Sequence, residues 1–286
     1  MCLSRARSLA PLGDGLPLFA SIAAIALATS TPARAQPPQK KNLQRPQSVQ
    51  MRLWVPAYFY PNGPGLREWN RLIVAARVVP IVAIVNPASG PGDQVDNHFV
   101  AILPRAREAG ITIVGYISTR YTHKKLLAAK REVDTFLKFY PDLQGFHFDE
   151  QTSDARGVDY YAELYNYVHK RIPGAHVLTN PGSSCEPEYA ARPASDAICL
   201  FEGEKGFDEF RPPAWVSRFP GARFCAVAHN VGTEAQMRRS VSRAAELKIG
   251  NLFITDDVVP NPYDCLPSYW DAEVEAVRRV NHLAKP

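Results

Sequence analysis

Short apolar runs rich in β-branched residues alternate with longer amphipathic stretches from Met51 to the end of the chain. Short runs bounded by turn residues predict buried strands, and apolar positions that recur every three or four residues predict helices. The predicted strands are Leu53–Phe59, Val79–Val85, Thr112–Ile117, Gly145–Asp149, His176–Asn180, Ala197–Glu202, Phe224–His229 and Leu252–Asp256. The predicted helices are Leu66–Ala76, Phe99–Ala109, Lys124–Phe139, Val158–Arg171, Glu234–Leu247 and Tyr269–Leu283.

This alternation predicts parallel pairing, because parallel strands cannot be joined by tight hairpins. Eight strands in about 235 residues fit a single α/β domain, a (β/α)8 barrel over residues 51–286, whose usual size is about 250 residues. The alternative is an open doubly wound sheet, which usually carries G-x-G-x-x-G after its first strand. That motif is absent, since residues 60–65 (YPNGPG) carry prolines where the helix would open. We therefore expect the barrel.

The first 35 residues have the pattern of a secretory signal peptide. Arg5 and Arg7 precede an apolar run from Leu16 to Ala28, and residues 33–35 (ARA) supply small side chains for cleavage. A membrane anchor is the alternative, but a run of about 13 residues is too short for a bilayer core that needs about 20. We expect cleavage after about Ala35, a disordered linker over residues 36–50, and a secreted or periplasmic mature protein without a membrane span.

The net charge of the chain limits the classes of partner that it can bind. The 286 residues carry a formal charge of +5, part of which belongs to the signal peptide. The small and dispersed remainder does not fit a nucleic-acid binder, which needs a basic patch or stripe. The 25 prolines indicate shaped loops rather than long helices. We expect a monomer without a nucleic-acid partner.

Four cysteines remain after the signal peptide, and in an exported protein they permit up to two disulfides. Cys199 and Cys225 lie in apolar strand runs, where buried free thiols are expected. Cys185 and Cys265 lie in loop sequence and are the better disulfide candidates. No C-x-x-C or His-rich spacing occurs, so we expect no metal and no cofactor.

Polar or aromatic residues stand at nearly every predicted strand end. In a barrel these ends converge on one face, where active sites are built. The Asn-Pro pairs at residues 86–87 and 180–181 can also be turn starts, so each asparagine alone fits either interpretation. The predicted pocket contains three acids, Asp149, Glu150 and Glu202, and nine substrate-binding residues, namely Tyr58, Tyr60, Asn86, Tyr116, His147, Asn180, His229, Asp256 and Asp257.

Residues 145–150 (GFHFDE) place an acid inside the predicted barrel. Side chains alternate along a strand, so the phenyl rings suit the helix-facing side and His147 and Asp149 point inward. A helix N-cap or a loop ion pair is the alternative role for Asp149. We expect His147 and backbone donors to keep Asp149 ionised. Glu150 points the other way if the strand stays regular, which predicts a supporting role.

A second acid, Glu202, ends the strand at residues 197–202. By alternation, Ile198 and Leu200 share its face, and apolar surroundings raise the pKa of a carboxyl group. Paired carboxylates among aromatic and amide side chains are the means of cleaving a glycosidic bond. We expect a retaining mechanism in which Asp149 is the nucleophile and Glu202 the general acid/base. No G-x-S-x-G, H-E-x-x-H or P-loop motif competes with this hypothesis.

The chain resembles the spherulin-4-like family. The resemblance rests on motifs that follow one another across the mature chain, namely residues 55–61 (VPAYFYP), 86–92 (NPASGPG), 115–119 (GYIST), 145–150 (GFHFDE), 180–182 (NPG), 201–202 (FE) and 266–270 (LPSYW). Two residues depart from the family pattern. Ala57 stands where a larger residue such as leucine is usual, and His147 stands where an aliphatic or aromatic residue is common.

The resemblance implies a (β/α)8 barrel and a secreted glycoside hydrolase that cuts α-1,4-linked galactosamine and N-acetylgalactosamine in exopolysaccharide, as in biofilms. It places the essential acids on Asp149, Glu150 and Glu202. The alternative is a non-catalytic surface or spore-coat protein that binds carbohydrate in the same cleft. A polysaccharide deacetylase fits less well, because it needs metal-binding histidines at strand ends and only His147 and His229 qualify.

Overall fold

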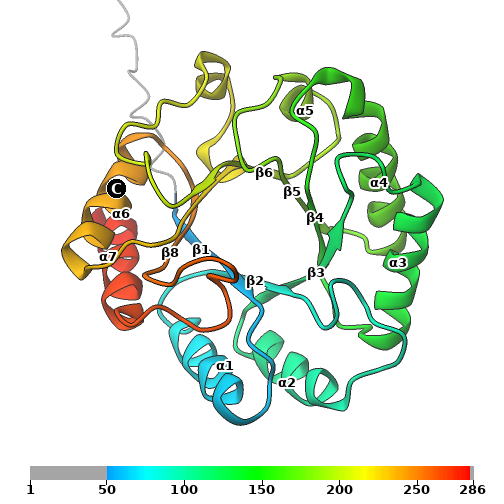
Figure 1. The fold of residues 1–286 in the computed structure, drawn as a ribbon, viewed down its shortest axis with the longest axis horizontal. Helices are drawn as coiled ribbons and strands as arrows, with labels where there is room; N and C mark the ends of the chain where they lie inside the picture. Colours follow the sequence, from blue (N-terminus) through cyan, green and yellow to red (C-terminus); the bar gives the residue numbers. More distant parts are fainter. Residues whose placement is uncertain (1–49, 284–286) are drawn as a thin grey trace, which may run out of the picture. The chain divides into compact units, whose positions relative to one another are not determined.

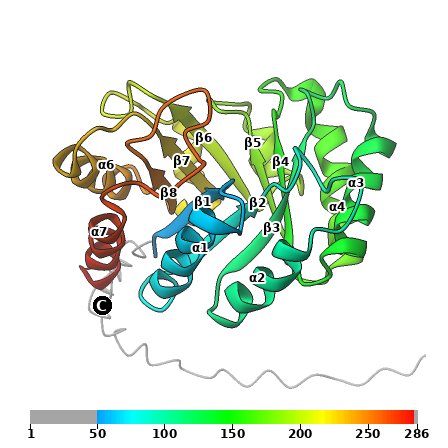
Figure 2. The same cartoon turned by 60° about the horizontal axis from the view of Figure 1, so that its bottom comes forward.

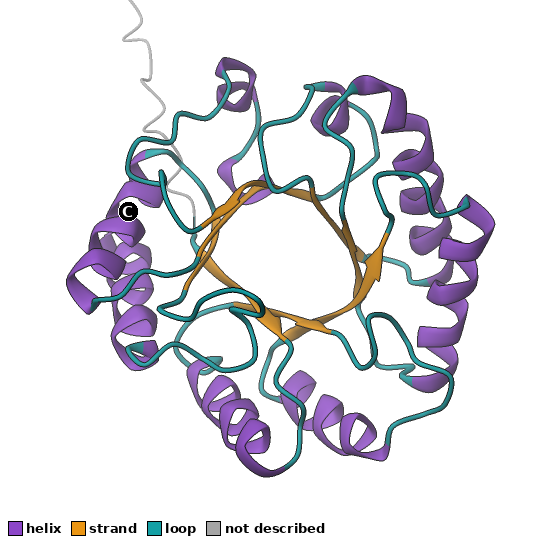
Figure 3. Ribbon diagram, viewed as in Figure 1, coloured by secondary structure: helices purple, strands orange, loops and turns teal. Residues whose placement is uncertain are grey.

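Eight parallel strands form a closed barrel in chain order in the computed structural model, which describes residues 50–283 (Figures 1 and 3). β1 pairs with β8, with Leu53 opposite Leu252, and this pairing closes the sheet. The (β/α)8 prediction is confirmed, and the open doubly wound sheet is excluded. The strands are β1 (Arg52–Ala57), β2 (Ile81–Val85), β3 (Thr112–Ser118), β4 (Gly145–Asp149), β5 (His176–Asn180), β6 (Ala197–Gly203), β7 (Phe224–Ala228) and β8 (Asn251–Ile254).

Helices surround the barrel on its outside (Figure 2). They are α1 (Gly63–Ala75), α2 (Asn97–Glu108), α3 (Leu126–Phe139), α4 (Val158–Arg171), α5 (Glu188–Ala191), α6 (Glu234–Glu246) and α7 (Trp270–Leu283). α1 opens within the proline-containing segment that we expected to disfavour a helix start. The Asn62 side chain accepts a hydrogen bond from the backbone N–H of Gly63, and Pro64 lies in the first turn, where its missing N–H costs nothing.

Two connections lack a long helix. β5 leads to β6 through the four-residue α5, and β6 leads to β7 through short 3-10 turns, η2 (Ala214–Arg218) and η3 (Gly221–Arg223). Pro212, Pro213 and Pro220 lie in the second connection. Proline interrupts a helix interior because it lacks an N–H and its ring clashes with the preceding turn. The loops on this side of the barrel are therefore longer and irregular.

Both faces of the strands are buried, as expected of a parallel sheet covered by helices. β4 shows the division between the two faces. Phe146 points outward and packs edge-to-face on Phe136 of α3, with ring centroids 5.8 Å apart. His147 points inward and packs edge-to-face on Trp54 of β1 at 5.7 Å. Gly145 opens the strand where no side chain fits, since a Cβ there would lie 1.9 Å from the carbonyl oxygen of His176.

The two loop cysteines do not form the candidate disulfide. Cys185 and Cys265, the better disulfide candidates, are both free, as are Cys199 and Cys225 within the barrel. Cys185 is buried, and burial raises its pKa to about 12. Cys265 is exposed, and its thiol donates to Asp257 Oδ2 at 3.6 Å. The two thiols therefore lie in different environments, one buried and one exposed.

The predicted signal peptide at residues 1–35, and all but the last residue of the predicted linker at 36–50, lie outside the described residues. Within residues 50–283, no helix is long and apolar enough to cross a membrane.

Candidate active site

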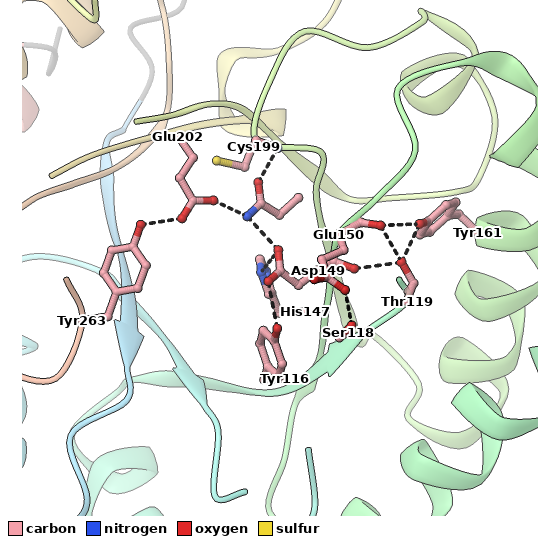
Figure 4. Close-up of polar contacts among 12 residues, drawn as sticks. Tyr116, Ser118, Thr119, His147, Asp149, Glu150, Tyr161, Cys199, Glu202 and Tyr263 are labelled. Carbon is pink, nitrogen blue, oxygen red and sulfur yellow. Dashed lines mark hydrogen bonds and ion pairs between the residues drawn. The ribbon is translucent and has the colours of Figure 1, made fainter. Parts of the chain in front are cut away.

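Asp149 ends β4 at the mouth of the barrel and is held by both neighbouring strands. Its Oδ2 accepts a hydrogen bond from the Tyr116 hydroxyl of β3 at 2.9 Å. Its Oδ1 accepts one from Nδ2 of Asn180, the last residue of β5, at 2.9 Å. Figure 4 shows Tyr116 and Asp149 pointing toward each other. The regular ladder of β4 therefore delivers Asp149 to the inner face that strand alternation predicts.

Burial raises the pKa of Asp149 above its ordinary value. The backbone N–H of Glu150 and the side chains of Tyr116 and Asn180 oppose this effect, because donors stabilise the ionised carboxylate. The net shift is upward, because the loss of hydration outweighs the three donors. The expectation that the surroundings keep Asp149 ionised stays a prediction.

His147 lies below Asp149 on the inner face, with its Nε2 3.9 Å from Asp149 Oδ1. Burial lowers the pKa of His147 to about 4, so its ring is neutral at neutral pH. The expected charge support for Asp149 from His147 is therefore absent. The ring supports Asp149 by packing, since it also stacks on Tyr116 at 6.2 Å between ring centroids.

The inward direction of Glu202 comes from a β-bulge in β6. In the ladder with β7, Cys199 lies opposite Cys225 and Glu202 lies opposite Val227, while the register shifts between Cys199 and Phe201. A bulge adds one residue to one strand and reverses the alternation beyond it. Cys199 and Glu202 therefore share the inner face although three positions separate them, as Figure 4 shows.

The outer face of β6 confirms this change of direction. Phe201 packs against Phe207 and Phe210, with ring centroids 5.0 and 5.3 Å away. We expected Ile198 and Leu200 to share the face of Glu202, and this is wrong because Leu200 is the extra residue of the bulge. The apolar environment predicted for Glu202 is replaced by a thiol below it and polar partners around it.

One amide nitrogen joins the two acids. Nδ2 of Asn180 donates to Asp149 Oδ1 at 2.9 Å and to Glu202 Oε2 at 2.5 Å. The amide is fixed from its other side, because Asn180 Oδ1 accepts a hydrogen bond from the N–H of Gly182 at 2.8 Å. Even end to end, bonds of 2.9 and 2.5 Å leave the two carboxyl oxygens closer than the about 6.5 Å at which inverting glycosidases begin.

Three tyrosines close around the acids. Tyr58, directly after β1, packs edge-to-face on Tyr116 at 5.7 Å and on Tyr263 at 5.8 Å. The Tyr263 hydroxyl donates to Glu202 Oε1 (Figure 4). Burial raises the pKa of each of these phenols, and the nearby acids raise it further. The phenols therefore stay protonated, and those of Tyr116 and Tyr263 donate to the acids.

Glu150 follows Asp149 directly, and its charge contributes to raising the pKa of Asp149. It has a φ of 54°, and its side chain accepts a hydrogen bond from the Ser118 hydroxyl of β3. The direction of Glu150 is set by this left-handed backbone, not by strand alternation, since β4 ends at Asp149. The supporting role assigned to Glu150 stays a prediction.

The remaining candidates fix loops at the same end of the barrel. Asn86 Oδ1 accepts from the N–H of Gly90 at 3.0 Å, which is the turn interpretation of its Asn-Pro pair. Asp256 accepts from the N–H of Ser268 at 3.1 Å and also from its hydroxyl. Tyr60 lies apart from the acids, because its hydroxyl donates to Asp96 at the start of α2 at 2.9 Å.

His229 follows β7, and its N–H donates to the carbonyl of Gly203 at 3.1 Å. It is nine-tenths buried, and its Nδ1 has no hydrogen-bond partner among the described residues. Glu202 and His229 thus lie on neighbouring strands at the barrel mouth. A sugar hydroxyl is one group that His229 could accept or donate to.

One cluster has the composition of a metal site. The ligand atoms of Asp257, Asp264 and Cys265 all lie within 4.8 Å of one another. Burial and the neighbouring Asp257 raise the pKa of Asp264, and the Cys265 thiol donates to Asp257. Shared hydrogen bonds therefore account for the closeness of these groups. Asp257 also caps its own turn, because its Oδ1 accepts from the N–H of Val258 at 2.8 Å.

Two polar partners of the acids escaped the sequence analysis, Tyr263 and Ser118. Tyr263 lies in the loop after β8, beyond the strand-end positions that we searched. Its signal is the segment at residues 261–265 (NPYDC), which resembles the other strand-end turns in having Asn before Pro. Ser118 ends β3 and stands opposite Asp149 in the ladder, so extending the predicted strand by one residue would have found it.

An open cleft of about 320 Å³ begins one residue beyond Glu202. Residues 203–209 form one wall, and Asn230, Val231 and Gln236 contribute the other. Its lining is mostly polar, with exposed acids and amides. Neither Asp149 nor Glu202 lines this groove, and Gln236 and Ser240 place it on the side of the strands that faces α6.

Comparisons with known proteins identify the family and agree with the barrel fold. The model of spherulation-specific family 4 matches residues 52–277. Spherulin-4 of Physarum polycephalum is 28% identical over 245 residues, which cover 82% of this chain and 72% of that protein. The crystal structure of Aspergillus clavatus Sph3 in complex with GalNAc is similar with a TM-score of 0.69 at 21% identity, covering 81% of this chain and 99% of that one. The spore cortex-lytic enzyme SleL of Bacillus megaterium QM B1551 is similar with a TM-score of 0.51 at 9% identity, covering 83% and 75%. Both structures support the barrel fold.

Proposed function

The chain belongs to spherulation-specific family 4, and from this premise we propose that it is a secreted glycoside hydrolase. Its proposed substrate is an exopolysaccharide of α-1,4-linked galactosamine and N-acetylgalactosamine. The family resemblance supports this substrate class, as does the GalNAc complex of the similar Aspergillus clavatus structure. The observation that carries the proposal is the pair of carboxylates, Asp149 and Glu202, joined by the amide nitrogen of Asn180.

The short distance between the acids favours a retaining mechanism. In the first step, a carboxylate oxygen of Asp149 attacks the anomeric carbon while Glu202 gives its proton to the departing glycosidic oxygen. In the second step, Glu202 takes a proton from water, and the resulting hydroxide displaces Asp149 from the sugar. A water molecule placed between the acids, as inversion requires, would need a wider gap than the shared amide allows.

The surroundings of the two acids suit these different roles. Burial raises the pKa of Asp149, and the desolvation that does so also makes the ionised carboxylate a stronger nucleophile. Glu202 lies next to the last residue of β6, and its Oε1 accepts a hydrogen bond from the Tyr263 hydroxyl. Asn180 contacts both acids and keeps their separation fixed through the two steps. Glu150 supports the site through Ser118.

Reducing-end release from purified galactosamine-rich exopolysaccharide tests the activity. The protein from Gln36 onward should release new reducing ends, and the Asp149→Asn and Glu202→Gln variants should not. Glu204→Gln is the matched control, because Glu204 is an exposed acid two residues beyond Glu202. Proton NMR of the first product should show the α-anomer of a retaining enzyme. Binding of the polymer without any cleavage by the wild type would overturn the proposal in favour of a carbohydrate-binding protein.

A further inference from the structure

The connection between β3 and α3 has an unusual backbone. Arg120, Tyr121 and Thr122 are consecutive and have φ values of 50°, 51° and 69°. The left-handed region is unfavourable for residues that carry a Cβ, and Gly, Asn or Asp usually occupy it. None of these three residues is of that kind. Such strain persists only where surrounding contacts enforce it, and it concentrates at functional positions.

Hydrogen bonds to the main-chain carbonyl groups of Asp149 and Glu150 hold this backbone in place. The N–H of Tyr121 donates to the carbonyl oxygen of Glu150 at 2.8 Å. The hydroxyl of Thr119 donates to the carbonyl oxygens of Asp149 and Glu150 at 2.8 and 2.9 Å. Figure 4 shows Thr119 between Glu150 and Tyr161 of α4. The strained loop is therefore attached to the backbone of the residues that carry the proposed chemistry.

The loop leaves one aromatic side chain open to solvent. Tyr121 is 53% exposed, and among the described residues neither a hydrogen bond of its hydroxyl nor an aromatic partner of its ring is found. Tyr60 is similarly exposed at 46%, but its hydroxyl is bound to Asp96 and its ring packs on His98 and Phe99. Tyr121 thus differs from Tyr60 in having a ring free to bind a ligand.

We propose that Tyr121 is a stacking platform for a sugar ring of a polymeric substrate, outside the two rings that flank the cleaved bond. This inference rests on the proposed glycosidase function. A hexosamine ring has an apolar face of C–H groups that packs well on an aromatic ring. The enforced backbone holds the platform at a fixed place relative to Asp149, which lowers the ordering cost of binding. The site thereby prefers chains over single sugars.

Substrate length separates this role from the chemistry. The test compares Tyr121→Ala with the wild type on an aryl α-N-acetylgalactosaminide and on oligosaccharides of increasing length. For the longer oligosaccharides, the variant should lose about ten-fold in kcat/KM through a higher KM, while the aryl glycoside is turned over as before. Tyr121→Phe should match the wild type, because it keeps the ring. Leu127→Ala is the surface control, since Leu127 is exposed in the first turn of α3.

A binding measurement keeps the test independent of turnover. In an Asp149→Asn background, Tyr121→Ala should weaken calorimetric binding of the longest oligosaccharide about ten-fold and leave the monosaccharide unaffected. Tyr121→Leu, which keeps apolar bulk without the ring, should behave as Tyr121→Ala does and guards against a folding artefact. Unchanged affinity, or an equal loss for all lengths, overturns the platform. A wild type that binds the oligosaccharides without cleaving them refutes the glycosidase alone, whereas one that binds none of them overturns both proposals.

Discussion

β4 and β6 each bring one acid to the same opening, but by different local geometry. β4 pairs without a register shift on both sides, so alternation alone carries Asp149 to the inner face. β6 has a bulge between Cys199 and Phe201, and only this irregularity turns Glu202 inward. With a regular ladder and the same residues, Phe201 would point into the barrel and Glu202 toward the helices.

The two strands also differ in what lies under the acid. Below Asp149 is the imidazole of His147, which is buried against Trp54. Below Glu202 is the thiol of Cys199, which donates to the carbonyl oxygen of Phe201 at 3.3 Å. The regular strand thus supports its acid with packed rings, whereas the bulged strand uses a small side chain that leaves space for the extra backbone. We expect the two strands to respond differently to mutation.

Removing the acids should have the largest effect and should distinguish them. Asp149→Ala should lower turnover by about 10⁴-fold on every substrate, because no nucleophile remains. Glu202→Ala should lose about as much on the polymer but much less on glycosides with activated leaving groups, which depart without a proton. Steady-state rates on both substrates provide the measurement. If Asp149→Ala were the variant rescued by a good leaving group, the two roles would be exchanged.

Two variants test whether the direction of each acid depends on the bulge: one removes the extra residue from β6, and the other adds an extra residue to β4. Deletion of Leu200 should regularise β6 and keep Glu202 inward, so the activity on an activated aryl glycoside should stay within about ten-fold of the wild type. Insertion of one alanine between Phe148 and Asp149 gives β4 an extra residue and should abolish this activity.

Circular dichroism and thermal unfolding establish that both variants retain the barrel. A folded Leu200 deletion without activity would show that the bulge itself, and not only the inward direction, is needed. An active insertion variant would show that β4 can form a bulge as β6 does.

The strand order of the barrel could be predicted from sequence because it rests on a repeated signal. The apolar runs at Gly145–Asp149 and His176–Asn180 coincide with β4 and β5, and Val158–Arg171 coincides with α4. The short α5 and the turns after β6 have no such periodicity. The polar pattern at strand ends likewise identified Asp149, Tyr116, Asn180 and Glu202, which the hydrogen bonds join in one group.

The remaining features depend on geometry that single residues do not encode. A bulge such as that at Leu200 has no composition of its own, so alternation assigned the wrong neighbours to Glu202. The neutral state of His147 follows from burial on all sides, which a strand pattern underestimates. Tyr60 and Asn86 were included because they end strands, but their side chains fix local loops. Convergence of the strand ends does not by itself place a side chain in the pocket.

The donors to the two acids should have separable effects on the pH profile. The rate should rise with pH through the raised pKa of Asp149, because only the ionised carboxylate attacks. Tyr116→Phe removes a donor that stabilises this ion, so the pKa should rise further and the acid limb of kcat/KM should move to higher pH. At neutral pH we expect a loss of about ten-fold.

Tyr263→Phe is the matched control for this measurement, because its hydroxyl contacts Glu202 rather than Asp149. It should lower kcat/KM while leaving the acid limb in place. Equal movement of the limb in both variants would mean that the acids titrate as one unit through Asn180.

The smallest expected effect is on stability and concerns the groups under the acids. The pKa of His147 is lowered from 6.5 to about 4 in the folded protein, so the unfolded chain binds a proton in the interval that the folded one does not. The contribution of His147 to the unfolding free energy is therefore fully present above pH 6.5 and is lost as the pH drops toward 4. Between pH 7 and 5 the imidazole should account for about 2 kcal/mol of the loss in unfolding free energy.

Urea unfolding of the His147→Leu variant should show a pH dependence of the unfolding free energy that is smaller than that of the wild type by this amount. Cys199→Ala, the equivalent change under Glu202, should leave the dependence intact, because thiols stay protonated throughout this range. A wild-type slope retained in His147→Leu would locate the titrating group elsewhere than on the inner face of β4.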